Sequence, residues 1–208
     1  MSDEIHNIRL NSEQFLTAAS IAAEVYHAVN IAKQLSFTSI NARVLAKHSG
    51  DTVLGFSELT KFIGYLATYM IDKANLINQL AIQLTNLTAQ LYRSHNTLDN
   101  MQQAERKFEN IEYIDSLNVS KQTLIKQIQH QHEDYQQLLK CLKQELDAVY
   151  RKIKSAELIA VMSRIETAEA PKNSSASFDE VANKIAQSGD TIMAHISRSL
   201  QLLSAIYP

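Results

Sequence analysis

The chain of 208 residues carries 20 lysines and arginines against 22 aspartates and glutamates, which gives a net charge of −2. This balance provides no basic field able to neutralise a phosphate backbone, so we expect no nucleic-acid partner. Only 4 glycines and 2 prolines occur, and none of them lies between Tyr65 and Ala170. Because strands and crossover connections need turn residues at regular intervals, the sequence predicts an all-α protein.

Cysteine usage and hydropathy indicate the compartment. The single cysteine, Cys141, excludes an internal disulfide framework and is typical of a reducing environment. No apolar run reaches the roughly 18 residues that a membrane-spanning helix needs. The first residues also lack the charged-then-apolar layout of a signal peptide. We therefore expect a cytoplasmic protein without membrane insertion.

The first predicted helix begins at a capping box formed by Asn11 and Gln14 and continues to about His48. Glycines in the segment 49–55 end it. Its expected packing seam has unusually small side chains at alternating spacings of three and four, which is typical of a coiled coil that allows close helix approach. The seam positions are Phe15, Ala18, Ala22, Val25, Val29, Ala32, Ser36 and Ser39.

Three further helices follow. The second begins near Phe56 and continues to a break predicted at 115–120, a stretch rich in N-cap residues. The third ends at the segment 171–177, the clearest loop in the chain. Ser177 and Glu180 form a capping box for the fourth helix.

The predicted helix lengths define an architecture, because the two middle helices are longer than the outer two. Short loops make consecutive helices antiparallel neighbours. The sequence therefore predicts an antiparallel four-helix coiled-coil bundle with a projecting two-helix coiled coil. Its expected parts are a first helical hairpin at 1–92, the projecting hairpin at 93–135, and a second hairpin at 136–208 that completes the bundle.

A faint internal repeat relates residues 33–80 to residues 154–202. The matched pairs are Phe37 with Leu158, Ile40 with Val161, Arg43 with Arg164, Val44 with Ile165, Phe56 with Phe178, Glu58 with Glu180, Leu59 with Val181 and Ile63 with Ile185. Gene duplication and a merely shared apolar period both account for these pairs. Under duplication, each hairpin supplies half of the bundle, and a monomeric pseudo-dimer is favoured over a homodimer.

The segment 40–51, which reads INARVLAKHSGD, resembles the hairpin tip of bacterial chemoreceptors, the methyl-accepting chemotaxis proteins. The following Gly55-Phe56 pair and the upstream Ile31-Ala32-Lys33-Gln34 are also similar to that family. The likeness covers about residues 25–90 and, more faintly, 150–206. It implies a cytoplasmic signalling hairpin that folds within a four-helix bundle.

The resemblance also implies where partners would bind and what they would be. The expected partner-binding residues lie on the first helix and in its turn: Phe37, Ile40, Asn41 and Val44, with Gly50 and Gly55 making the turn. The implied partners are a chemotaxis histidine kinase, its coupling protein, or other receptor tips. Apolar side chains beside one amide form a small specific docking patch.

Catalytic and metal-binding patterns are weak in this sequence. His130 and Asp134 have helical i, i+4 spacing, but two ligands leave a zinc site half empty. No glycine-rich phosphate loop or ordered nucleophile triad occurs, so we expect no enzyme activity, no metal and no cofactor. A structural coiled-coil adaptor that binds an unrelated protein through its projecting coil is the alternative to a signalling module.

Overall fold

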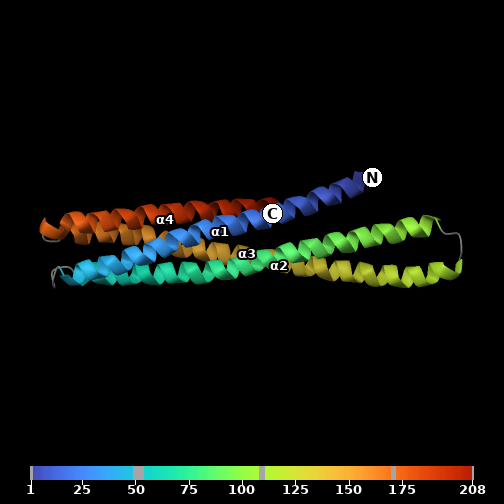
Figure 1. The fold of residues 1–208 in the computed structure, drawn as a ribbon, viewed down its shortest axis with the longest axis horizontal. Coiled ribbons are helices and arrows are strands. Elements are labelled where there is room, and N and C mark those ends of the chain that lie inside the picture. The colour runs from blue at the N-terminus through green and yellow to red at the C-terminus, as the bar shows by residue number, and fades with distance from the viewer. Residues whose placement is uncertain (1, 49–53, 108–110, 170–171, 208) are drawn as a thin grey trace.

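The computed structural model describes residues 2–48, 54–107, 111–169 and 172–207 (Figure 1). These residues form four helices: α1 (Ser2–His48), α2 (Leu54–Lys107), α3 (Ile111–Glu169) and α4 (Lys172–Ile206). No strand occurs in the described ranges. The predicted all-α class is confirmed.

In cross-section the four helices occupy the corners of a square, and each packs against the helices at the two adjacent corners. α1 contacts both α2 and α4, and α3 contacts the same two helices from the opposite corner. Consecutive helices run in opposite directions, and α2 and α3 extend together beyond the end of α4 (Figure 1). The molecule is thus an antiparallel four-helix bundle with a projecting two-helix coiled coil, as the sequence predicted.

The buried positions of α1 follow a strict seven-residue repeat, which winds the helices into a left-handed supercoil. They are Ala18, Ile21, Val25, Ala28, Ala32, Leu35, Ser39, Ala42 and Ala46. The predicted seam of α1 is wrong at several positions, because Val29 and Ser36 are only half-buried while Ala28 and Leu35 are fully buried. Small and apolar residues occupy two adjacent registers of this helix, so spacing alone does not separate them.

Larger side chains of the other helices fill the space that α1 leaves. α3 contributes Tyr135, Leu139, Leu142, Leu146, Val149 and Ile153 to the main core, where they meet residues of α2 and α4 such as Met70, Ile77, Leu84, Ile192, Ile196 and Leu203. An ion pair from Lys73 Nζ to Glu145 Oε2, at 2.7 Å, joins α2 to α3 beside this core. Small residues on α1 and large residues on its neighbours therefore fill the main core, and two smaller clusters, one of Leu35, Ile63 and Ile185 and one of Ala42 and Ala46, continue it toward the connection between α1 and α2.

The character of α2 and α3 changes where the other two helices stop covering them. Their last buried residues toward the projecting end are Ser94 and Tyr135. Beyond them, the described side chains in 95–107 and 116–134 are half-buried or exposed. Lys121 Nζ lies 2.7 Å from Glu105 Oε2 and links the two helices of this projecting hairpin.

Three predicted helix boundaries are wrong. The stretch 115–120 lies inside α3, because N-cap residues without glycine or proline do not stop a helix that has a packed partner. α4 begins at Lys172, so Ser177 and Glu180 are not its cap, and Glu180 instead pairs with Lys184. α1 begins at Ser2 and continues through the predicted capping box at Asn11.

Tyr135 is almost completely buried, and its hydroxyl has no hydrogen-bond partner among the described residues. An unsatisfied buried hydroxyl destabilises the folded state. We expect Tyr135→Phe to raise the free energy of unfolding by about 0.5–1.5 kcal/mol in urea denaturation at neutral pH. Tyr65→Phe is the matched control, because the Tyr65 side chain is exposed and should leave stability unchanged.

Burial also raises the pKa of Tyr135 to about 12, from an ordinary value of 10.0. Between these values the unfolded chain loses this proton while the folded chain keeps it, so stability falls as the pH rises above 10. The free energy of unfolding of Tyr135→Phe, measured by urea denaturation, should therefore fall less steeply above pH 10 than that of the wild type. An equal decline in wild type and variant would contradict the assignment.

Candidate partner-binding site

An exposed stripe of large apolar side chains lies on the last turns of α1, next to the connection to α2. Its members are Phe37, Ile40 and Val44, with exposed fractions of 68%, 51% and 51%. Asn41 is also exposed on this part of the helix. The spacing of three and four residues puts the three apolar side chains on one face, directed away from the bundle core. We call these three residues the α1 stripe.

α3 carries a second stripe of the same kind at the same end of the bundle. Leu158, Val161 and Ile165 repeat the spacing of the α1 stripe, with exposed fractions of 64%, 51% and 59%. Because α1 and α3 occupy opposite corners, the two stripes lie on opposite sides of the bundle. These residues are the ones that the internal repeat pairs with one another. We call them the α3 stripe.

Gly50 and Gly55 are the two glycines that the sequence places in the turn between the first two helices. Gly55 lies in the first turn of α2, which begins at Leu54, so its assignment to the turn is wrong. α2 begins two residues before the predicted start at Phe56, because the periodic apolar segment that follows sustains the helix through Leu54 and Gly55. Gly50 lies outside the described residues.

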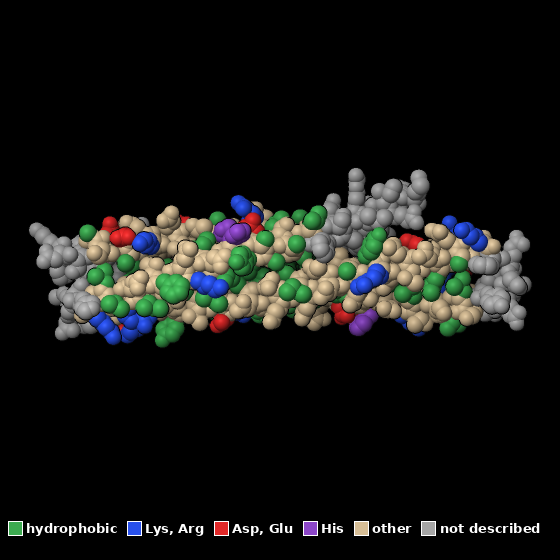
Figure 2. Space-filling model, in the orientation of Figure 1, with side chains coloured by type: hydrophobic (Ala, Val, Ile, Leu, Met, Phe, Trp, Pro, Cys, Tyr) green, Lys and Arg blue, Asp and Glu red, His purple; other side chains and the backbone are tan. Residues whose placement is uncertain are grey.

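A polar cleft opens beside the α1 stripe, between α1 and α2. It has a volume of about 450 Å³ and is lined by Ser36, Ser39, Ile40, Arg43, Lys61, Gly64, Tyr65 and Thr68. Figure 2 shows green hydrophobic and blue basic side chains close together toward the left end of the bundle, the end where Figure 1 places the connection between α1 and α2. Spacing within one helix does not predict this cleft, and its signal in the sequence is Gly64, a lone glycine inside a helix, which indicates a packing reason for a missing side chain.

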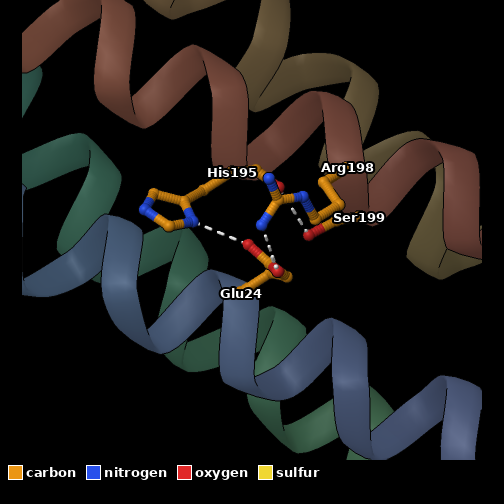
Figure 3. Close-up of polar contacts among 4 residues, drawn as sticks. All are labelled: Glu24, His195, Arg198 and Ser199. Atoms are coloured by element: carbon orange, nitrogen blue, oxygen red, sulfur yellow. Dashed lines mark hydrogen bonds and ion pairs between the residues drawn. The ribbon is translucent and has the colours of Figure 1, made fainter.

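A second polar cluster joins α1 to α4 (Figure 3). His195 Nδ1 lies 2.6 Å from Glu24 Oε2, and Arg198 Nη1 lies 3.1 Å from Glu24 Oε1. The ring of His27 stacks on that of His195, with centroids 5.5 Å apart. The hydrogen bond with His195, helped by the Arg198 guanidinium, lowers the pKa of the Glu24 carboxyl against the opposing effect of burial.

Ser199, His195 and Glu24 include the residue types of a hydrolase triad, but their geometry differs from one. The Ser199 hydroxyl donates to the backbone carbonyl of His195 at 3.0 Å, one helical turn away, and not to its imidazole (Figure 3). A histidine activates a serine only through a hydrogen bond between ring nitrogen and hydroxyl. The cluster therefore serves as an inter-helix contact.

We expect Glu24→Gln to lower the free energy of unfolding by about 1–2 kcal/mol at neutral pH, because charge-assisted hydrogen bonds to His195 and Arg198 are lost. The lowered pKa means that this stabilisation is present above 4.5 and is lost as the pH falls through the folded-state pKa. Thermal unfolding of both proteins should therefore differ at pH 7 and converge in acid. Glu180→Gln, which removes an exposed ion pair, is the control with little effect.

His130 lies 3.8 Å from Asp134 and 3.9 Å from Glu133, and all three side chains are exposed. No group of three or more histidine, cysteine, aspartate or glutamate side chains is placed to hold a metal within the described part of the chain. None of the described helices is long and apolar enough to cross a membrane.

Comparison of the chain with known proteins gives no match to a protein-family model, to a curated protein or to a solved structure.

Proposed function

We propose that this protein is a chemoreceptor-like signalling module that binds protein partners through the end of the bundle where α1 meets α2. The partners are a chemotaxis histidine kinase, its coupling protein or receptor tips. It carries out no chemistry of its own, and it acts in the cytoplasm as a monomer whose two hairpins imitate a dimer. The resemblance of residues 40–51 to chemoreceptor tips supports the choice of partners.

The observation that carries the proposal is the exposed α1 stripe. Three large apolar side chains at successive turns, more than half exposed, cost solvation free energy unless another surface covers them. The α3 stripe repeats this arrangement on the opposite side of the same end. Together the stripes suit a bundle that presents two similar faces to partners.

The test is a calorimetric titration of the full chain against the coupling protein and the kinase of the same organism. We expect Ile40→Asp to weaken binding by about tenfold or more, because a carboxylate then replaces an apolar contact. Asn41→Arg should weaken it similarly by adding bulk and charge. Ile125→Asp is the matched control, an exposed isoleucine on the projecting hairpin that should leave binding unchanged.

The alternative function is a coiled-coil adaptor that binds an unrelated protein through the projecting hairpin. Val119 favours it, because this β-branched residue is 68% exposed on a hairpin with few buried positions. Under this alternative, Ile125→Asp weakens partner binding and Ile40→Asp spares it. Absence of binding to both chemotaxis proteins would contradict the first proposal.

A further inference from the structure

The cleft between α1 and α2 contains one positive charge with no counter-ion. Arg43 makes no ion pair with any residue that the structure describes, and its Nε is buried without a hydrogen-bond partner. The other cation lining the cleft, Lys61, is bound to Glu58. The free charge of the cleft is therefore one unit, which matches a monoanion better than a doubly charged phosphate.

Two of the four hydroxyl groups that line the cleft are engaged within the protein, which leaves the Arg43 guanidinium with the hydroxyls of Ser36 and Tyr65 as donors. Ser39 Oγ already donates to the Thr60 carbonyl at 2.9 Å, and Thr68 Oγ1 donates to the Gly64 carbonyl at 3.0 Å. A guanidinium presents two parallel N–H groups in the geometry that a carboxylate accepts. The chemistry of the cleft thus matches a carboxylate.

Gly64 keeps this space open. A Cβ at this position would stand 3.0 Å from Ser39 Oγ and 3.5 Å from Arg43 Nη2. An alanine would therefore crowd the cleft beside the guanidinium without removing any charge. This gives a second way to perturb the site that leaves Arg43 itself intact.

The cleft is continuous with the α1 stripe, because Ile40 belongs to both. We infer that the cleft receives the carboxylate of an aspartate or glutamate side chain from a protein partner whose apolar residues cover the α1 stripe. This inference rests on the proposed function of the stripe as a docking surface. It adds the chemical identity of the residue that fixes the position of the partner.

The test uses a displayed library of randomised amphipathic helical peptides, selected for binding to the immobilised full chain. Selected peptides should carry an aspartate or glutamate beside apolar residues. Changing that acid to its amide should weaken binding of the peptide to the wild type by about tenfold. The same change should hardly affect binding of the peptide to the Arg43→Gln variant. The four affinities form a double-mutant cycle that measures the coupling between the acid and Arg43. Gly64→Ala should weaken binding too, whereas Arg151→Gln, which removes an exposed charge on α3, should not.

Thermal melts verify that each variant is folded. If Arg43→Gln does not fold, the effect of Gly64→Ala on peptide binding tests the carboxylate inference instead. Peptides that require Ile40 but tolerate Arg43→Gln, Gly64→Ala and loss of their acid would overturn the carboxylate inference and leave the docking function standing. Peptides whose binding survives Ile40→Asp, or a selection that yields no binders, would overturn both.

Discussion

Leu146→Ala is expected to lower the free energy of unfolding by about 3 kcal/mol, within the range of 2–5 kcal/mol typical of buried leucines. Leu146 is 0% exposed and lies at the centre of the α3 contribution to the core. Truncation removes its apolar contacts and leaves a cavity that the long helices on either side cannot close. Urea denaturation followed by circular dichroism would measure the loss.

Leu158→Ala is the control, because it makes the same change on the same helix at a side chain that is 64% exposed. Its effect on stability should stay within about 0.5 kcal/mol. The pair separates core packing from helix propensity, which both substitutions change equally. Equal effects at the two positions would contradict the orientation of α3.

Ala28→Leu should destabilise the protein by about 1–3 kcal/mol through overpacking. Ala28 is completely buried at the α1 seam, where small side chains let the neighbouring helices approach closely. A leucine there forces side chains away from their preferred rotamers or pushes α1 outward. The measured quantity is again the midpoint of urea denaturation.

Ala19→Leu is the matched control, because Ala19 is exposed on the same helix. Its stability should equal that of the wild type within about 0.5 kcal/mol. This comparison also tests the seam register, since the sequence alone favoured Val29 rather than Ala28. If Ala28→Leu leaves the free energy of unfolding unchanged, the result would contradict the burial of Ala28 and favour the predicted register, in which Val29 lies in the seam.

Much of the fold followed from the sequence because long helices leave strong signals. The absence of glycine and proline between Tyr65 and Ala170 predicts the all-α class, and the greater length of the two middle helices predicts the projection. The α1 register was harder, because its alanines and serines differ little in hydrophobicity between adjacent faces. Helix ends were misplaced where capping residues lie within a helix that packing sustains.

The candidate site was predictable in part. The sequence pointed to Phe37, Ile40, Asn41 and Val44, and the structure puts all four on exposed positions at one end of the bundle. The Arg43 cleft and the Glu24 contact with His195 were missed, because each joins residues of two helices. No spacing within one helix reveals which side chains meet across the bundle.

The length of α2 has a mechanical consequence. Its 54 residues span about 81 Å at 1.5 Å per residue. A ligand at the tip of the projecting hairpin and another at the opposite end of the bundle would be held apart by about this distance. Because α2 and α3 are each one continuous helix, they fix the separation between the two ends of the molecule.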